Sequence, residues 1–231
     1  ALEKADSLGV NIFSVSLGYY EFDNAQWDLT YMDMNGTTTR CSRAATIAAR
    51  KGMLVCVAAG NEGNKTWHYI DCPADADSIL AVGAVTPQGG IVSFSSRGPS
   101  SDGRTKPDVC AVGSGTCLLH PDYTSPFYGN GTSFACPLLA GMAASLWSAL
   151  PDENAMQIRE RILRYANRYT VPDNNYGYGI PNAWAAYTGT TDIPCVSTTE
   201  EAHKVLINNE LRIIIGTKTY NILGKEMELN P

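Results

Sequence analysis

The sequence lacks several features that would assign it to a common class of protein. Its longest apolar runs, "MLVCVAAG" and "GMAASLWSAL", are too short to span a bilayer. The net charge of -6 comes without a basic cluster for nucleic acid and without an acidic block. The seven cysteines form no CxxC pair and no zinc spacing. We therefore expect no membrane span, no nucleic-acid partner, and no metal or cofactor held by this chain.

The cysteines also argue against a disulfide framework. Their number is odd, and Cys56 and Cys136 lie within apolar patterns, where free thiols behave as small hydrophobic groups. At 231 residues the chain is long enough for one substantial domain and a short appendage. Its opening, "ALEKADSLGV", is typical of the last turns of a helix that ends at Gly9 and has no N-cap. We therefore expect the sequence to be part of a longer protein.

Short apolar runs alternate with helical patterns through most of the chain. Residues 10–18, 53–60 and 78–85 are strand candidates, and the continuous apolar character of 53–60 predicts burial on both faces. A helix is predicted at 37–52, with a cap among Thr37 to Thr39 and a stop at Gly52. A second helix is predicted at 132–151 and is apolar enough to be buried, and a third is predicted at 151–169 and is amphipathic. This alternation predicts an α/β fold with a mostly parallel central sheet.

Two segments differ in texture from the rest. Residues 19–36 carry aromatic and acidic residues without periodicity. From residue 190, a Thr-rich linker precedes an alternating pattern that turns at Asn208-Asn209 and at Gly216, which predicts a small antiparallel hairpin array. We place a domain boundary here, with one domain over 1–189 and an appendage over 190–231.

The stretch "YGNGTSFACP" places Ser133 at the start of the predicted buried helix. A nucleophilic serine needs a free backbone N–H beside it to meet a developing oxyanion, and a helix start provides one. Gly131 would let a substrate approach closely, and Pro137 fits within the first turn. The alternative is that Ser133 merely caps the helix.

The stretch "VCVAAGNEGN" delivers Asn61 at the end of a buried strand. Ligands bind at the carboxyl ends of parallel strands, and the Asn amide could donate to an oxyanion there. The alternative is a turn residue that favours left-handed backbone geometry.

Five blocks decide between these alternatives: "SVSLG", "VAAGNEG", "VSFSSRGPSSDGRTKPDVCAVG", "NGTSFACPLLAG" and "YGYGIPNAWAAY". Their order and spacing over residues 1–187 resemble the subtilisin-like serine peptidases. Val112 and Leu138 depart from the usual family pattern, where Pro and His are common, but both lie outside the chemistry. The resemblance implies a three-layer fold and a serine endopeptidase that acts on polypeptides through an acyl-enzyme.

The resemblance also implies roles for single residues. Ser133 matches the nucleophile, and Asn61 matches the side-chain donor to the oxyanion. The edge against which substrate adds as an extended strand matches Ser16, Leu17 and Gly18. The opposite wall of the pocket for the substrate's P1 side chain matches Ala58, Ala59 and Gly60, and Gly131 and Thr132 are assigned to substrate binding with them.

Asp71 falls near the position where the family closes the base of the P1 pocket, counted back from Pro73. A carboxylate at that base would favour Arg or Lys at P1. The alternative is an ordinary solvated loop aspartate, so the choice stays open at this stage.

The base that would activate Ser133 has no counterpart in the sequence. The family orders its triad Asp, His, Ser, and neither an Asp-Thr/Ser-Gly strand end nor a His-Gly-Thr-His helix start is present. None of His68, His120 and His203 has the sequence context of a catalytic base held by a carboxylate. We therefore expect the chain alone to be inert, and its partners to be a polypeptide substrate and the missing N-terminal portion of the same domain.

The tail "HKVLINNELRIIIGTKTYNILGKEM" resembles the C-terminal sorting hairpins of secreted Bacteroidetes proteins. This resemblance implies a bacterial protein that is secreted or held at the cell surface. Two other readings stay open: an inactive, subtilase-like protein that only binds peptides, and a chain whose functional unit is the tail, as an anchoring module.

Overall fold

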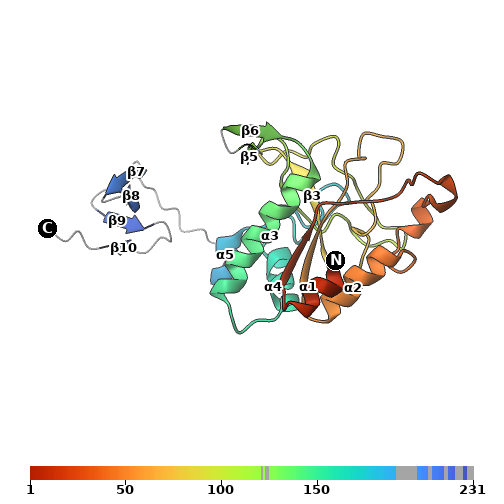
Figure 1. Ribbon diagram of the computed structural model, residues 1–231, viewed down its shortest axis with the longest axis horizontal. Coiled ribbons are helices and arrows are strands. Elements are labelled where there is room, and N and C mark those ends of the chain that lie inside the picture. The colour runs from red at the N-terminus through yellow and green to blue at the C-terminus, as the bar shows by residue number, and fades with distance from the viewer. Residues whose placement is uncertain are drawn as a thin grey trace. The chain divides into compact units, whose positions relative to one another are not determined.

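The computed structural model describes residues 1–120, 122 and 125–190, together with four strands between 202 and 227. The chain divides into two compact units, Ala1–Asp192 and Ile193–Pro231 (Figure 1). The boundary predicted between residues 189 and 190 stays a prediction about domain organisation.

A four-stranded parallel sheet forms the centre of the first unit. Its order is β1 (Ile12–Val15), β2 (Leu54–Ala58), β3 (Leu80–Val85), β4 (Val109–Val112). Every residue of β2 and β3 is buried, which explains their unbroken apolar sequences. The predicted parallel sheet is confirmed, and β1 is shorter than predicted because the chain stops pairing after Val15.

Helices cover both faces of this sheet and make three layers (Figure 1). On one face α3 (Thr132–Ala149) and α4 (Ala155–Arg164) pack against side chains that include Cys56, Leu80 and Val82. On the other, α1 (Leu2–Ser7) and α2 (Arg40–Arg50) pack against the alternate strand residues Val55, Val57 and Ala81. Alternation of side chains along each strand separates the two cores, and the predicted three-layer α/β architecture is confirmed.

Local capping fixes where the helices begin. Thr39 accepts a hydrogen bond from the Ser42 N–H at 3.1 Å and starts α2. Asn154 and Gln157 form a reciprocal capping box at α4. The predicted start of α4 at residue 151 is therefore wrong by four residues, because the chain caps at Asn154.

The prediction that α3 is buried holds for only one of its faces. Leu139, Ala143 and Leu146 face the core, whereas Leu138 is 48% exposed. By length and composition alone this 18-residue helix could cross a membrane, although 39% of it is buried within the fold. The helix is apolar all round, so its sequence could not indicate which face the sheet would cover.

Several elements were not predicted. They are the 3-10 turns η1 (Ala25–Trp27) and η2 (Tyr31–Asp33), the hairpin of β5 (Thr116–Leu119) and β6 (Pro126–Gly129), strand β4, and helix α5 (Ala183–Thr188). All of them are short or weakly patterned segments, so their sequences carry little periodic signal.

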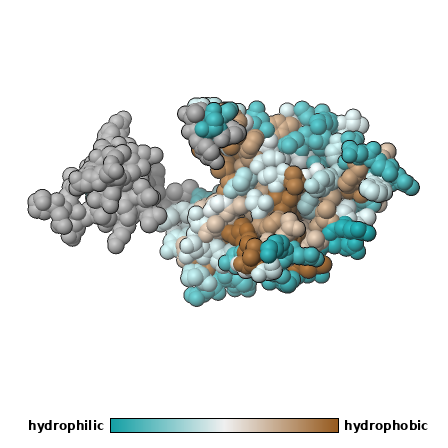
Figure 2. Space-filling model, viewed as in Figure 1, coloured by the Kyte–Doolittle hydropathy of each residue, from teal (hydrophilic) through white to brown (hydrophobic). Residues whose placement is uncertain are grey.

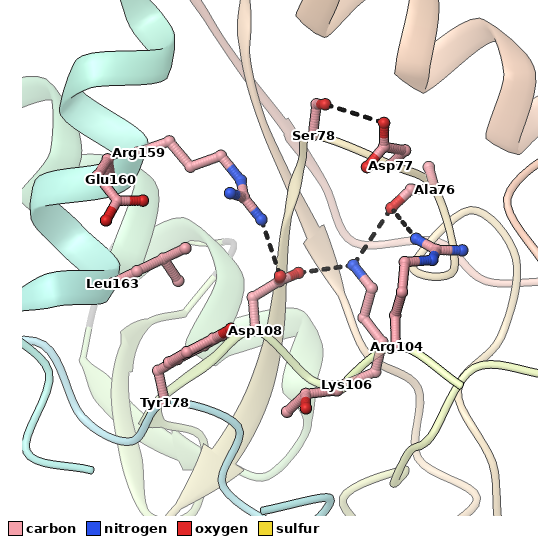
Figure 3. A pocket seen from close by; sticks show the side chains of 11 residues that line it. Ala76, Asp77, Ser78, Arg104, Lys106, Asp108, Arg159, Glu160, Leu163 and Tyr178 are labelled. Atoms are coloured by element: carbon pink, nitrogen blue, oxygen red, sulfur yellow. Dashed lines mark hydrogen bonds and ion pairs between the residues drawn. The ribbon is translucent and has the colours of Figure 1, made fainter. Parts of the chain in front are cut away.

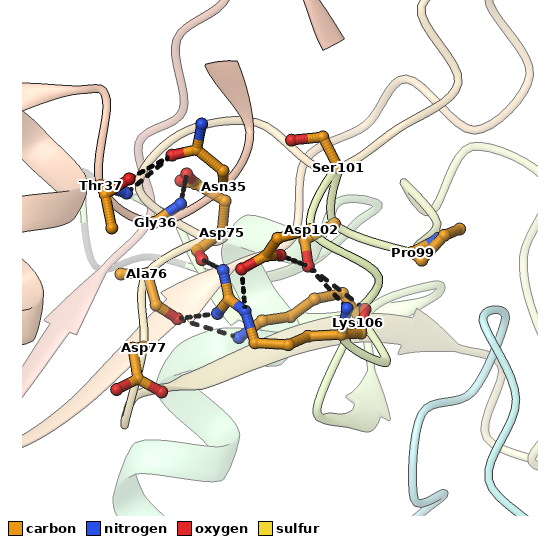
Figure 4. Close-up of polar contacts among 12 residues, drawn as sticks. Asn35, Gly36, Thr37, Asp75, Ala76, Asp77, Pro99, Ser101, Asp102 and Lys106 are labelled. Atoms are coloured by element: carbon orange, nitrogen blue, oxygen red, sulfur yellow. Dashed lines mark hydrogen bonds and ion pairs between the residues drawn. The ribbon is translucent and has the colours of Figure 1, made fainter. Parts of the chain in front are cut away.

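At the amino ends of β3 and β4, a buried ion cluster joins strands, loop and helix. Asp108 accepts hydrogen bonds from Lys106 Nζ at 2.7 Å and from an Arg159 guanidinium nitrogen at 3.0 Å (Figure 3). It also accepts one from the Ala81 N–H at 2.8 Å. Lys106 Nζ also donates to the Ala76 carbonyl at 3.2 Å (Figure 4). Arg104 donates to the same carbonyl at 3.3 Å (Figure 3). Burial lowers the pKa of Lys106, which is 2% exposed, and Asp108 opposes that shift.

The second unit is an antiparallel array of β7 (Ala202–Ile207), β8 (Glu210–Ile215), β9 (Lys218–Asn221) and β10 (Glu226–Met227). Ile207 pairs with Glu210, and Ile215 pairs with Lys218. The predicted antiparallel pairing is present in these strands, and the predicted turn residues Asn208, Asn209 and Gly216 lie outside the described residues. His203 lies in β7, and its side chain is outside the described residues.

Candidate active site

Ser133 lies in the first turn of α3, at the carboxyl edge of the sheet. Gly131 caps the helix with φ +155°, and a Cβ there would meet no atom closer than 3.7 Å. Conformation rather than space therefore requires this glycine. The Gly131 N–H donates to Gly113 O at 2.7 Å, which fixes the helix start beside the end of β4.

Asn61 and Ser133 are brought together through Thr132. The Asn61 Oδ1 accepts hydrogen bonds from the Thr132 N–H at 2.9 Å and from the Thr132 hydroxyl at 3.0 Å. The Thr132 Oγ1 in turn accepts from the Gly60 N–H at 3.3 Å. Thr132 is fully buried, so the loop after β2 and the start of α3 are joined by a solvent-shielded bridge.

This bridge also settles which way the Asn61 amide points. A backbone N–H can only donate, so the atom facing Thr132 N must be the amide oxygen. The Nδ2 group is therefore directed away from the bridge, and no hydrogen bond from it is recorded within the described residues. The Ser133 backbone N–H, one of the first in α3, likewise has no recorded acceptor there. Among the described residues, two donors without an acceptor therefore adjoin the bridge: the Nδ2 group of Asn61 and the N–H of Ser133, which follows Thr132 in the chain.

The two segments predicted to line the substrate site lie at the carboxyl ends of two adjacent parallel strands. The pairing of β1 with β2 ends at Val15 and Val57. Ser16–Gly18 follows β1, and Ala58–Gly60 consists of the last residue of β2 and the two residues after it. The first wall is exposed and no backbone partner is recorded for Leu17 or Gly18 in the described part of the chain. The Ser16 hydroxyl donates to Ser133 O at 2.8 Å, so this edge adjoins the candidate nucleophile.

Asp71 lies between the two walls. A Cβ built on Gly18 would stand 2.9 Å from Asp71 Oδ2, and one built on Gly60 would stand 2.4 Å from the same oxygen. The backbone holds this segment in place, because Asp71 N–H donates to Ala59 O at 3.1 Å. Asp71 is 6% exposed. The alternative of a solvated loop aspartate is therefore wrong.

Burial dominates the electrostatics of this carboxyl group. It raises the pKa of Asp71 to about 7, with a further increase from Glu62 and opposing effects from Lys65 and the Trp67 indole N–H. Its Oδ1 is buried without a hydrogen-bond partner. Glu62, by contrast, is held by the Tyr20 hydroxyl at 3.1 Å and by Lys65 Nζ at 2.9 Å.

Among the described residues, no histidine contacts the Ser133 hydroxyl, which lies 3.4 Å from Ser16 O. The His68 ring packs edge-on against Tyr69, with Nδ1 2.9 Å from Gly63 O, as expected for a packing role. His120 pairs with Asp122 at 2.7 Å in the β5–β6 hairpin and is half-exposed. Its sequence context did not predict this pairing, but neither group contacts the site.

The sheet edge at β1 is open and apolar. β1 is an end strand with no partner on its outer side in the described chain. Beside it, Leu2, Phe13, Val15, Leu17 and Ala44 line a hollow of about 290 Å³. Brown, apolar atoms gather on the face of Figure 2 where α1 and β1 lie in Figure 1.

Comparisons with known proteins show the family to which the chain belongs. The model of the subtilase family matches residues 1–179, and the chain belongs to that family of serine peptidases. It is 33% identical to subtilisin DY of Bacillus licheniformis over 193 residues, which cover 80% of this chain and 66% of the relative. The serine protease AprX of Bacillus subtilis is 30% identical over 197 residues, which cover 75% of this chain and 42% of AprX. The chain thus spans about two fifths to two thirds of these relatives.

Solved structures show the same fold. The prenylagaramide maturation protease PagA has a TM-score of 0.62 at 25% identity, covering 82% of this chain and 66% of PagA. MycP1 from Mycobacterium smegmatis has a TM-score of 0.60 at 24% identity, covering 84% of this chain and 54% of MycP1. At this identity the likeness concerns the fold.

Sequence reasoning missed two parts of the site. One is the role of Thr132 as the buried bridge to Asn61. The other is the arrangement of Tyr20 and Lys65 around Glu62. The Glu62–Lys65 spacing was a local signal for their ion pair, whereas the contact with Tyr20 depends on where the 19–36 segment folds.

Proposed function

We propose that this chain carries the nucleophile and the oxyanion-binding half of a serine endopeptidase site. In the proposed reaction Ser133 Oγ attacks the carbonyl carbon of a peptide bond and gives up its proton to a base. The carbonyl oxygen becomes an oxyanion, which the Ser133 N–H and the Asn61 Nδ2 group stabilise. Departure of the amine leaves an acyl-enzyme, which water then hydrolyses.

The bridge of Asn61 to Thr132 is the observation that carries this proposal. Because the Asn61 oxygen is held by Thr132, the Asn61 Nδ2 group remains as a side-chain donor next to the residue that precedes Ser133, and the Ser133 N–H remains as a backbone donor. A helix cap alone would not need a second loop anchored to the helix start by two hydrogen bonds to one oxygen. The substrate in this scheme is a polypeptide that adds as an extended strand along Ser16–Gly18.

In this proposal the base and its orienting carboxylate come from a segment outside this sequence. The open edge of β1 and its apolar surroundings support that view, because an unpaired parallel strand with exposed apolar neighbours is suited to a further strand. An unassisted serine hydroxyl is a weak nucleophile at neutral pH. Without the added segment, we expect the chain to bind peptides and not to cleave them.

The test compares the 231-residue chain with a form extended by the coding sequence that precedes Ala1 in its gene. A fluorophosphonate probe is expected to label Ser133 in the extended form and leave the shorter chain unlabelled. If the extended form contains Asp and His motifs and still resists the probe, the proposal is wrong. If it contains neither motif, the peptide-binding alternative replaces it.

A second prediction concerns Asn61 in the extended form. Asn61→Ala removes one of the two proposed donors, and loss of one such donor in subtilisin lowers kcat by about 10²–10³. We carry that magnitude over and expect a similar fall in kcat with little change in KM, because the donor acts on charge that appears in the transition state. Asn64→Ala, an exposed residue of the same loop, is the matched control. An equal loss in both variants would remove Asn61 from the mechanism.

We further propose that the protein is exported to the bacterial cell surface or beyond. The support is the resemblance of the tail to sorting hairpins and the antiparallel order of β7 to β10.

A further inference from the structure

We infer that the slot between Ser16–Gly18 and Ala58–Gly60 selects a cationic P1 side chain, lysine or arginine, through the Asp71 carboxylate. This inference rests on the proposed function, because the slot becomes a P1 pocket only if Ser133 is the nucleophile. The inference also predicts that the chain binds a cation next to Asp71, and this binding can be measured without any catalytic activity.

The gap between the two walls is narrow where they approach Asp71, and it ends at the Asp71 carboxylate. The Asp71 Oδ2 stands where a Cβ on Gly60 or on Gly18 would collide, at 2.4 and 2.9 Å. Both glycines are therefore required for the carboxylate to fit between the walls. An extended alkyl chain with a charged end suits such a slot, whereas an aromatic P1 ring would have to lie against the carboxylate.

The charges around the slot point to the same ligand. Glu62 has its own cation, Lys65, and its own hydroxyl donor, Tyr20. Asp71 has no ion pair, and its Oδ1 is buried with no partner in the described structure. A buried, incompletely paired carboxylate is unfavourable by itself, and an ammonium or guanidinium group would supply the missing donors.

The pH dependence follows from the Asp71 group. With a pKa of about 7, the carboxyl is about one tenth ionised at pH 6 and about nine tenths ionised at pH 8. Of the neighbouring titratable groups, Tyr20 and Cys72 have pKa values raised to about 12, so both stay neutral over this range. Glu62 and Lys65 are the charged groups that face Asp71. Cation binding is therefore expected to strengthen as pH rises from 6 to 8.

The first experiment titrates n-propylguanidinium, a mimic of the arginine side chain, into the 231-residue chain and follows the Gly18 and Gly60 amide signals by NMR. The ligand keeps its charge at both pH values. We expect shifts at both glycines and an affinity five- to tenfold higher at pH 8 than at pH 6. The neutral n-propylurea should bind at least tenfold more weakly at pH 8.

Asp71→Asn should reduce the affinity at pH 8 at least tenfold and remove its pH dependence. Asp152→Asn, which makes the same charge change at an exposed site, should behave as the parent chain. Unchanged binding by Asp71→Asn, or shifts that avoid Gly18 and Gly60, would overturn the inference.

The second experiment measures kcat/KM of the extended form on peptides that differ only at P1. We expect Lys and Arg to be preferred over Leu and Phe at pH 8, and Asp71→Asn to abolish that preference. Fluorophosphonate labelling of the unsubstituted extended form reports separately on whether Ser133 is reactive. Best cleavage after Leu or Phe would overturn the inference with the peptidase proposal still standing. Absence of labelling would count against the peptidase, with the binding result still standing.

Discussion

Ser133→Ala is expected to reduce kcat of the extended form to background. Removing the nucleophile of subtilisin lowers kcat about 2 × 10⁶-fold, and we carry that magnitude over to a site with the same fold and family membership. We expect no other residue to replace the nucleophile, because Ser133 is the described hydroxyl that adjoins both the Asn61–Thr132 bridge and the Ser16–Gly18 edge. Peptide hydrolysis and probe labelling should disappear together.

Ser145→Ala is the control for that result. Ser145 lies on the exposed face of the same helix, where its hydroxyl donates to Gly141 O at 3.1 Å. Ser145→Ala removes a serine hydroxyl oxygen, as Ser133→Ala does, but at a position that does not contact the candidate site. Both variants should keep the parent's thermal midpoint within a few degrees. Persistent turnover in Ser133→Ala would mean that another residue is the nucleophile.

Asp108→Ala is expected to lower the free energy of unfolding of the 231-residue chain by about 3–5 kcal/mol, the usual cost of removing one partner of a buried ion pair. The change leaves Lys106 Nζ buried with the Ala76 carbonyl as its acceptor. It also removes the acceptor of the Ala81 N–H and of one terminal guanidinium nitrogen of Arg159, whose Nε still donates to Ile79 O. Chemical denaturation measured at pH 7 gives the result.

Glu160→Ala is the control, because Glu160 lines the same hollow as Asp108 and is exposed (Figure 3). It should cost no more than about 0.5 kcal/mol. The double variant Lys106→Met/Asp108→Ala should recover part of the loss, since it removes the stranded cation together with its partner. A loss below about 1 kcal/mol in Asp108→Ala would show that the cluster contributes little to folding.

The cluster and the candidate site lie at opposite edges of the same parallel sheet. Asp108 precedes β4 and accepts from Ala81 in β3, whereas Asn61 follows β2 and meets α3 at the carboxyl edge. Separation along the sheet predicts that Asp108→Ala acts on stability and leaves the binding properties of any protein that remains folded largely intact.

The predictions from sequence succeeded best for elements that a short local pattern identifies without reference to the rest of the chain. The apolar runs of β2 and β3 and the alternating pattern of the tail strands each identify their element locally. The boundaries of α4 and the exposed side of α3 were predicted wrongly, because a neighbouring cap in one case and the extent of the sheet in the other decide them.

The residue types of the site were also visible in the sequence, but their relations were not. Ser133 and Asn61 are 72 positions apart, and only the adjacency of β2 and α3 puts Thr132 between them. Position in the chain could not tell whether Asp71 was solvated. Its burial depends on Gly18 and Gly60, which come from two other segments.

The order of residues by itself determined the α/β class, the family and the identity of the serine and asparagine, because periodicity and short motifs are properties of neighbours along the chain. Tertiary structure alone decided that the Asn61 amide nitrogen is directed away from the bridge that its oxygen forms, that Asp71 is buried next to Gly18 and Gly60, and that β1 has no strand on its outer side among the described residues. These features arise where segments distant in sequence meet, and the burial and pairing of a polar group depend on every segment that surrounds it.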